Sequence, residues 1–492
     1  MAVRRFSGGE IPHRDRIPWR ATRHWAADRT IGAAASPAPT LKLGPLTINL
    51  DGVFVFGLFL SMLLTSEFAA KAIAVFAAIV PFYLWTRRRD AIWSLLQNTL
   101  LLLIPGLALF SVLWSEAPGA TARYAIQFGL TVTAALLMSS AKDQQAVLRG
   151  ITAAFLVYIV ASVAVGGSVG VGVGSGGSAF SGLTDSKNLV ADVAATGILV
   201  SVVVGFLAFR RGNYIWLAAC VVAVLLDVYV LIGARSAGAI LSAGAGLMAM
   251  AALAPLGLMH PAVRAALVVV VTTAIVIVGL GYRWISAALI TLASDVFDKD
   301  PTLTGRTYLW YRASDLIAEK PALGRGYFAF WLQGNIDAEG LWRYAGIRSR
   351  SGFTFHNAAV EILVGLGYVG LAVIGTAVLI AAVILAVRVV REPTPVLAFW
   401  LVILLYELSR APIESVGMTP FYHSTVLVFA ALGAAFGKRA TSWVAPGPAG
   451  KPVSFRAAPY EESRANAALS IPHAGGSMRL RQPADQAPLQ PR

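Results

Sequence analysis

The sequence carries few charged residues for its length. Only 13% of its 492 residues are Asp, Glu, Lys or Arg, whereas soluble domains carry about 25%. These charges lie in short groups between apolar runs of about 20 residues, the length of helix that crosses a hydrocarbon core of about 30 Å. The pattern excludes a soluble enzyme and predicts an all-α polytopic membrane protein.

Several chemical signatures are also missing. The single cysteine, Cys220, lies in an apolar run, which excludes an intramolecular disulfide. The sequence has no Cys/His metal-binding spacing, no Walker motif and no Ser nucleophile elbow. We therefore expect neither a metal ion nor another cofactor, and no ATP-driven transport unless a partner chain supplies the motor.

About twelve transmembrane helices are predicted within a transmembrane domain over residues 46–437. The apolar runs cover 46–64, 68–85, 92–113, 121–139, 147–168, 189–209, 214–232, 237–257, 264–281, 359–387, 396–412 and 421–437. The flanking tails, 1–45 and 438–492, are rich in basic residues, Pro and Ala. We expect both tails to be mostly disordered.

The excess of positive charge predicts an orientation in the membrane rather than a nucleic-acid partner. The formal net charge of +15 arises mainly from the two tails and from alternate turns, such as Arg87-Arg88-Arg89 and Arg210-Arg211. Because cytoplasmic loops collect Lys and Arg, both termini are predicted to be cytoplasmic.

Two longer segments are then expected on the outer side. The stretch from Gly166 to Gly182 lacks the strand and the Lys-Ser/Thr of a phosphate-binding loop, and its composition indicates a mobile loop. The segment 282–358 is far longer than an ordinary connection. Within it, residues 305–319 have the period of an amphipathic helix that lies at the membrane surface. Its predicted apolar face consists of Leu309, Ala313, Leu316 and Ile317.

Polar residues at and within the predicted spans are the first candidates for chemistry. Lys187-Asn188 opens the sixth run, and Asp192 follows one helical turn later on the same face. The lysine either anchors the helix at the interface or contacts an anion beside the N–H groups of the helix N-terminus. Asp192 and Asp227 lie in apolar runs, so we expect each to face the bundle interior and find a partner, for which Arg235 is a candidate.

The large loop supplies a second set of candidates. Arg306 opens the amphipathic helix, and its guanidinium suits bidentate phosphate binding, although a solvated arginine is the common alternative. His356-Asn357 ends the loop and opens the tenth run, with Glu361 one turn below Asn357. A histidine at a membrane interface is more often structural, but a neutral imidazole here can take a proton from a hydroxyl near pH 7. Asn357 equally suits the N-cap of a helix.

Three stretches resemble the O-antigen ligase and polymerase superfamily, most closely its exopolysaccharide-polymerisation branch. They are Phe180-Ser-Gly-Leu-Thr-Asp-Ser-Lys187-Asn188, then Leu303-Thr-Gly-Arg306-Thr-Tyr-Leu-Trp310 with Pro321-Ala-Leu-Gly-Arg-Gly-Tyr-Phe-Ala-Phe330, and Gly352-Phe-Thr-Phe-His356-Asn357-Ala-Ala-Val-Glu361. Trp114-Ser-Glu-Ala-Pro118 also fits. The resemblance covers about residues 50–435.

This resemblance implies a membrane-embedded, metal-independent, inverting glycosyltransferase. Its donor is an undecaprenyl-diphosphate-linked oligosaccharide at the periplasmic face of the bacterial inner membrane, and its product is exopolysaccharide or O-antigen. The large loop is then periplasmic. His356 takes the position of the base, oriented by Asn357 and Glu361. The implied diphosphate-binding residues are Arg306, Lys187, Arg235 and Asn188. The ligase branch tends to have Arg at the position of Lys187, so this lysine favours the polymerase branch.

Other functions remain as alternatives. A ligase with the same donor chemistry transfers the glycan to a lipid A core. A secondary transporter or flippase of polysaccharide precursors also carries buried charges such as Asp192, Asp227, Glu407 and Arg410, but the two halves of this chain are not similar, as inverted repeats would be. A non-catalytic scaffold is the third alternative. The expected partners are membrane lipid, a chain-length regulator and an export complex, and no nucleic acid.

Overall fold

The computed structural model describes most of the chain between its two tails. The described residues are 40–43, 46–170, 177–184, 186–280 and 306–437. The predicted tail 438–492, most of the tail 1–45 and the start of the large loop lie outside them. Strand β1 (Thr40–Leu43) pairs antiparallel with β2 (Leu46–Asn49). The end of the predicted N-terminal tail is therefore a strand, and the first predicted run begins as a strand.

Most apolar runs form helices that begin and end within a few residues of the predicted positions. Where polar residues precede the runs, side-chain oxygens cap the first turn: Asp143, Ser186 and Asn213 accept backbone N–H groups at the starts of three helices. These helices are α1 (Leu50–Leu63), α2 (Thr65–Thr86), α5 (Pro118–Ser139), α6 (Gln144–Val165), α7 (Lys187–Arg210), α8 (Tyr214–Gly233), α9 (Ala237–Leu253), followed by the 3-10 helix η2 (Ala254–Leu258), α10 (Pro261–Leu280), α14 (Ala358–Arg391), α15 (Pro395–Arg410) and α16 (His423–Phe436).

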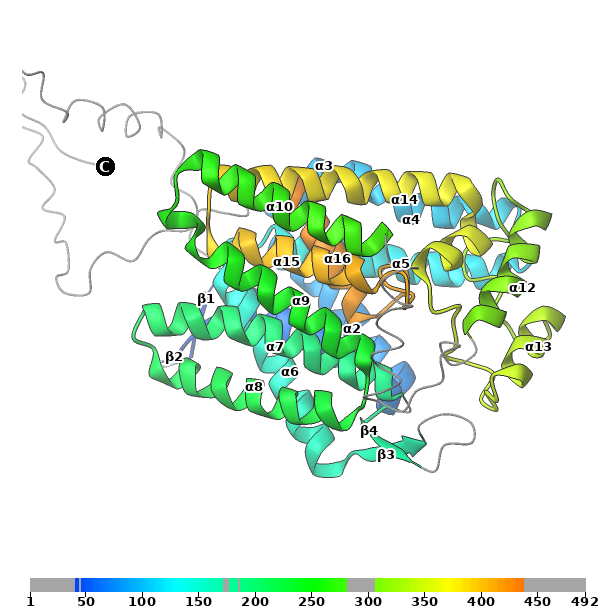
Figure 1. Cartoon of the computed structure of the whole chain (residues 1–492), viewed down its shortest axis with the longest axis horizontal. Coiled ribbons are helices and arrows are strands. Elements are labelled where there is room, and N and C mark those ends of the chain that lie inside the picture. Colours follow the sequence, from blue (N-terminus) through cyan, green and yellow to red (C-terminus); the bar gives the residue numbers. More distant parts are fainter. Residues whose placement is uncertain (1–39, 44–45, 171–176, 185, 281–305, 438–492) are drawn as a thin grey trace, which may run out of the picture. The chain divides into compact units, whose positions relative to one another are not determined.

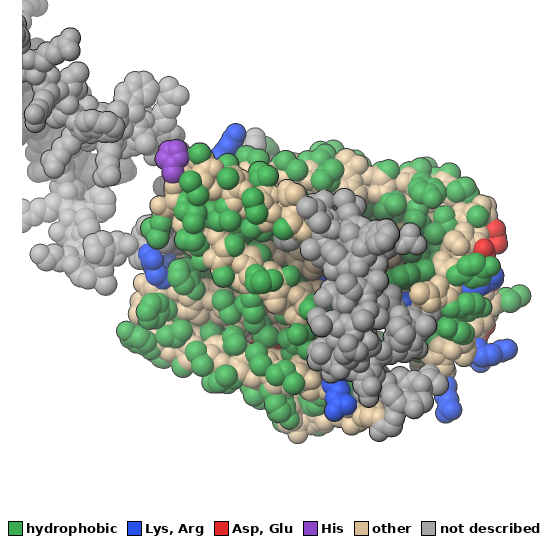
Figure 2. All heavy atoms as spheres, viewed as in Figure 1, with side chains coloured by type: hydrophobic (Ala, Val, Ile, Leu, Met, Phe, Trp, Pro, Cys, Tyr) green, Lys and Arg blue, Asp and Glu red, His purple; other side chains and the backbone are tan. Residues whose placement is uncertain are grey.

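Five helices of the described residues are long and apolar enough to cross a membrane. They are α6, α7, α8, α9 together with η2, and α14, and a sixth span arises if α2 and the helix after it form one bent span. The described part of the face shown in Figure 2 is mostly apolar, and most of its Lys, Arg, Asp and Glu side chains lie toward the ends of the helices. This distribution suits a hydrocarbon core bounded by two polar interfaces. The chain is a largely helical membrane protein, and the number of twelve spans stays a prediction.

The predicted run 92–113 is interrupted. It is divided between α3 (Arg88–Gln97) and α4 (Thr99–Phe110), and the short 3-10 helix η1 (Ser111–Leu113) follows α4. Asn98 lies between the two helices, and its side-chain amide donates to the Ser94 carbonyl oxygen at 2.9 Å. The polar side chain therefore satisfies a backbone group at the break.

The Gly-rich stretch 166–182 is not a simple loop. Strands β3 (Gly167–Gly170) and β4 (Ser178–Gly182) pair antiparallel, and the tip between them lies outside the described residues. The predicted mobile loop is therefore wrong at both ends, where glycine-rich segments pair as a hairpin beside the start of α7.

Helix α14 is broken at Gly367. This residue has φ 64° and ψ −165°, and a Cβ at this position would lie 2.3 Å from the Ala322 carbonyl oxygen. The next two amides leave the helix: Tyr368 N donates to Pro321 O at 2.8 Å, and Val369 N donates to Ala322 O at 3.1 Å. Backbone polar groups within a membrane-spanning helix need protein partners. The carbonyl groups of Pro321 and Ala322 in the large loop are these partners at the break.

Replacing Gly367 by Ala is expected to destabilise the protein by at least about 1–3 kcal/mol, because a Cβ meets both a strained backbone region and a fixed carbonyl group. Gly375→Ala is the matched control, since Gly375 lies in the same helix with nothing within 4 Å of a Cβ. Thermal unfolding in detergent measures both variants. An unchanged melting temperature for Gly367→Ala contradicts the break.

The described part of the large loop folds around its own core, and we call residues 306–357 the cap. Helix α12 (Arg306–Glu319) agrees with the predicted helix to within one residue. Its face of Leu309, Ala313 and Leu316 is buried within the cap rather than on lipid. The partner is a second helix, α13 (Ile336–Tyr344), and both lie at one end of the long helices (Figure 1). The cap core also contains Phe330, Ala338, Leu341, Trp342 and Phe355, with Val364 of α14.

Helix α13 is absent from the sequence prediction, although ordinary helix signals mark it. The Asn335 side chain caps its first turn by accepting from Asp337 N at 3.1 Å, and Gly346 beyond its end has φ 71°. Such a pair of residues is typical of a short helix.

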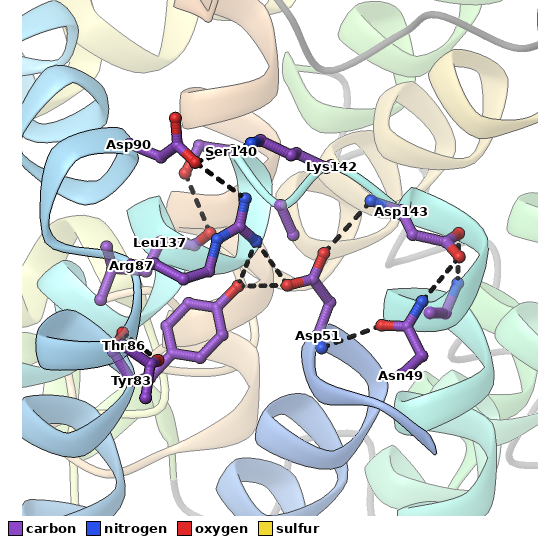
Figure 3. A network of polar contacts seen from close by, with 12 residues as sticks. Asn49, Asp51, Tyr83, Thr86, Arg87, Asp90, Leu137, Ser140, Lys142 and Asp143 are labelled. Atoms are coloured by element: carbon purple, nitrogen blue, oxygen red, sulfur yellow. Dashed lines mark hydrogen bonds and ion pairs between the residues drawn. The ribbon is translucent and has the colours of Figure 1, made fainter. Parts of the chain in front are cut away.

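A buried polar network joins the starts of α1 and α6 to the end of α2 (Figure 3). Arg87, predicted to lie in a cytoplasmic turn, is only 8% exposed, and its guanidinium contacts Asp51 and Tyr83. The Tyr83 hydroxyl donates to Asp51 Oδ1 at 2.7 Å, Asp143 N donates to Asp51 Oδ2 at 3.2 Å, and Asn49 Nδ2 donates to Asp143 Oδ2 at 2.9 Å. The pairing compensates the burial of the Asp51 and Arg87 charges, so the Asp51–Arg87 pair helps to hold the three helices together, and Arg87 is more than a part of the charge of its turn.

Candidate active site

His356 lies where the cap meets α14 and is held by a carboxylate. Its Nδ1 is 3.2 Å from Oε2 of Glu414, a residue of the segment between α15 and α16. The two side chains are each 24% exposed, so a substrate can reach them. His356 has φ 50°, an uncommon backbone region for a residue other than Gly. A carboxylate at Nδ1 favours the tautomer that carries its proton there, which leaves the Nε2 lone pair as a base.

Arg306 contacts the same carboxylate from its other side. Its Nη2 is 3.0 Å from Glu414 Oε1, and its Nη1 donates to the Ile413 carbonyl oxygen at 2.6 Å. Burial would raise the pKa of Glu414, but the hydrogen bond with His356 and the charge of Arg306 together lower this pKa below its ordinary value. Glu414 is thus an ionised bridge between the predicted base and a predicted anion-binding residue at neutral pH.

The other predicted cations lie near this bridge. Lys187 is the first residue of α7, and the charges of Arg235 and Arg306 both act on its ammonium group. Arg235 is exposed in the turn between α8 and α9, with φ 50°. The neighbouring Ser236 donates its hydroxyl to Asn188 Oδ1 at 3.2 Å, which ties this turn to the start of α7. The fold therefore brings the turn of Arg235 to the start of α7, within the electrostatic range of Lys187.

Asn357 holds the backbone beside the histidine rather than its ring. Its Oδ1 accepts from Val360 N at 3.1 Å as the N-cap of α14, and its Nδ2 donates to Pro412 O at 3.1 Å. The N-cap alternative from the sequence is confirmed. The side chain also joins the start of α14 to the segment that carries Glu414.

Glu361 likewise binds the neighbouring segments. One carboxylate oxygen accepts from Trp331 Nε1 at 3.0 Å, and the other accepts from Phe355 N at 2.9 Å and from the Ser415 hydroxyl at 3.3 Å. Among the described residues, the carboxylate that contacts the His356 ring belongs to Glu414. Asn357 and Glu361 instead bind the backbone on either side of His356, and their role in orienting this histidine stays a prediction.

Glu414 is the main residue that the sequence prediction lacks. It follows the eleventh run, in Arg410-Ala-Pro-Ile-Glu414, on the same predicted side of the membrane as His356. An acidic residue in an outer turn is a weak signal, because nothing local indicates that it meets a histidine 58 residues away.

A buried ionic cluster lies one helical turn below Asn188. Asp192 Oδ1 is 2.5 Å from Arg410 Nη1, and Asp192 Oδ2 is 3.1 Å from His423 Nε2. Asp192 therefore faces the bundle interior as predicted, but its partner is Arg410 rather than Arg235. Asp227 is also buried, and its Oδ1 has no hydrogen-bond partner among the described residues, so the expected partner of Asp227 is not found there.

Two comparisons with known proteins support the expected resemblance. Residues 222–375 match the O-antigen ligase family, a region that includes Arg235, Arg306 and His356. Over 330 residues the chain is 29% identical to the exopolysaccharide production protein ExoQ of Rhizobium meliloti (strain 1021), a match that covers 66% of this chain and 74% of that protein. Both similarities confirm the resemblance predicted from the motifs, and with the apolar helices they indicate a membrane protein of the O-antigen ligase or polymerase type.

Proposed function

We propose that this chain, which belongs to the O-antigen ligase superfamily, is a polysaccharide polymerase. It transfers a glycan from a polyprenyl diphosphate to a hydroxyl of another lipid-linked oligosaccharide, at the periplasmic face of the bacterial inner membrane, with both termini cytoplasmic. The observation that carries this proposal is the bridge of Arg306, Glu414 and His356. The similarity to a protein named for exopolysaccharide production favours the polymerase over the ligase.

The reaction needs a base and a site for a growing negative charge. His356 Nε2 takes the proton of the acceptor hydroxyl, and the oxygen bonds to the anomeric carbon of the donor. The bond from that carbon to the diphosphate oxygen breaks, and its electron pair leaves with the diphosphate. Attack from the face opposite the leaving group inverts the anomeric configuration. A single positioned base typically contributes about 10²–10⁴-fold in rate.

Three cations stabilise the diphosphate as its charge grows. Arg306 uses part of its N–H set on Ile413 and Glu414, and its other N–H groups remain for an anion. Lys187 adds a charge at the N-terminus of α7, whose free amides also favour anions. Such groups act best when they are fixed before the reaction. The left-handed backbone of both Arg235 and His356 is the kind of strain that occurs at functional sites.

Glu414→Gln is expected to lower turnover by about 10–100-fold, a part of the about 10²–10⁴-fold that a positioned base contributes. The variant removes the charge that holds His356 and Arg306 but keeps the side-chain shape. Since the pKa of Glu414 is lowered, the carboxylate and the stability it contributes are present at neutral pH and are lost as pH falls through that lowered pKa.

Glu339→Gln is the matched control for Glu414→Gln, because Glu339 lies in the cap, away from His356, and pairs only with the exposed Arg350 among the described ion pairs. Turnover of purified protein on a lipid-linked oligosaccharide measures both variants. Wild-type turnover by Glu414→Gln would mean that the bridge has no part in the reaction.

The proposed function is tested by mass spectrometry of polyprenyl-linked glycans in a deletion strain. Complementation with the wild-type chain provides the reference. Accumulation of single repeat units on the carrier in the deletion strain, reversed by the wild type, is the expected result for a polymerase.

Two other outcomes decide against polymerisation. Accumulation of full-length lipid-linked polymer assigns the chain as a ligase, which acts after chain extension. An unchanged lipid-linked pool contradicts both enzyme functions and favours a transporter or flippase of precursors.

A further inference from the structure

Two sequence segments that the reaction does not use bind each other. Trp114, in the turn before α5, donates its Nε1 proton to the Leu323 carbonyl oxygen at 2.9 Å. Glu116 N donates to Arg325 O at 3.0 Å. Gly326, with φ 102°, lies so close to Ser115 that a Cβ would meet the hydroxyl oxygen at 2.4 Å. The segment 321–327, which we call the wedge, therefore packs against this turn.

A buried ion pair also joins the wedge to the turn before α5. Arg325 is 8% exposed, and its Nη1 donates to Glu116 Oε1 at 2.6 Å while its Nη2 contacts Glu319. Lys320 also reaches Glu116 Oε1, at 2.8 Å, but its side chain is 43% exposed. Of these two cations only Arg325 is enclosed. Loss of the Arg325 guanidinium therefore removes an enclosed contact with Glu116, whereas water can replace the contact of the exposed Lys320.

The wedge also forms backbone hydrogen bonds with α14 just before its break. Arg325 N donates to Val364 O and Gly326 N donates to Gly365 O, both at 2.9 Å. Val364 and Gly365 lie before the break, and Tyr368 and Val369 lie after it. The wedge therefore forms backbone hydrogen bonds on both sides of the break. The Arg325 backbone is therefore bonded both to the turn and to the broken helix.

The wedge is bonded to α14 and directly follows α12 in the chain, and these two helices carry the proposed site. Helix α12, which begins at Arg306, ends at Glu319 just before the wedge. The first segment of α14, residues 358–366, directly follows His356 and precedes the break at Gly367. A shift of the wedge therefore changes the position of His356 relative to Arg306.

We propose that Arg325 is a positioning residue for the transfer reaction. By pairing with Glu116 it fixes the wedge, and through the break in α14 the wedge fixes the direction of residues 358–366 and of His356. This inference rests on the proposed function. In this proposal the motifs Trp114–Pro118 and Pro321–Phe330 bind each other and together position His356.

The first test compares Arg325→Gln with Arg325→Lys and Lys320→Gln in purified protein. We expect Arg325→Gln to lower kcat at least tenfold with the KM for the lipid-linked donor within twofold, because the diphosphate-binding side chains are untouched. Arg325→Lys restores part of the loss. Lys320→Gln, which contacts the same Glu116 oxygen from an exposed position, stays within twofold of wild type. A wild-type kcat per folded molecule for Arg325→Gln overturns the proposal.

The second test does not depend on activity. Cys220 is buried, so spin labels attach selectively to cysteines introduced at the exposed positions Tyr311 in α12 and Ala359 in α14. The distance distribution between the labels is expected to broaden or shift in Arg325→Gln and to remain unchanged in Lys320→Gln. An unchanged distribution in Arg325→Gln overturns the positioning role. If the wild-type chain has no transfer activity, the proposed function is wrong. The distance measurement still decides whether Arg325 positions α14 relative to α12.

Discussion

Replacing His356 by Ala is expected to lower glycan transfer by about 10²–10⁴-fold, the contribution of a general base, while the protein remains in the membrane at its normal level. The imidazole is the proton acceptor of the proposed reaction. Its loss leaves Arg306 and Lys187 able to bind the donor, so the KM for the donor stays close to that of wild type. Repeat units on the carrier accumulate in cells that carry this variant.

The backbone of His356 requires a second variant. Its φ of 50° is tolerated by Asn better than by Ala, so His356→Asn keeps the local conformation while removing the base. Both variants are expected to lose activity to a similar degree. Turnover with a lipid-linked oligosaccharide, normalised to folded protein, is the measurement.

His260→Ala is the matched control for the His356 variants, because His260 is exposed in the turn before α10. It is expected to leave turnover unchanged. Near-wild-type polymer from both His356 variants would falsify the assignment of the base and with it the mechanism proposed above.

The positions of the helices follow from local sequence, because apolar length and capping residues are local properties. Helix α8 (Tyr214–Gly233) differs from its predicted run by one residue, and α12 begins at Arg306, one residue from the prediction. The breaks do not follow in this way. Gly367 lies in an apolar run that reads as one helix, and what opens it is the backbone of Pro321 and Ala322, which is distant in sequence.

The site was predictable in its residue types but not in its pairings. Lys187 and His356 stand out because polar groups at the ends of apolar runs are few, and Arg306 stands out because it opens the amphipathic helix of the large loop. The partner of His356 is Glu414, from a turn two helices later, and the partner of Asp192 is Arg410 rather than Arg235. Hydropathy predicts the depth of such residues and the distribution of Lys and Arg predicts their side of the membrane, but side-chain pairing depends on how the helices pack.

The cluster around Asp192 is where a substitution is expected to cost most stability. Asp192 is fully buried and Arg410 is 4% exposed. Arg410 Nη1 lies 2.5 Å from Asp192 and 3.1 Å from Glu407 Oε2. The hydroxyls of Tyr406 and Tyr422 each donate to Asp192 at 3.0 Å. One guanidinium therefore serves two buried carboxylates on α7 and α15.

Arg410→Met is accordingly expected to destabilise the protein by about 3–5 kcal/mol, since it keeps the volume but leaves two buried acids without their cation. Asp192→Asn is expected to cost less, about 1–3 kcal/mol, because Arg410 keeps Glu407 and the amide oxygen still accepts from one of the two tyrosines. Arg312→Ala is the control: its ion pairs in the cap are about 40% exposed, and such pairs contribute less than about 1 kcal/mol. Thermal unfolding in detergent, with the amount of folded protein in the membrane as a second readout, ranks the three variants. If Arg410→Met is as stable as Arg312→Ala, the cluster does not hold α7 against α15, and Lys187 and Glu414 must be kept in register by other contacts.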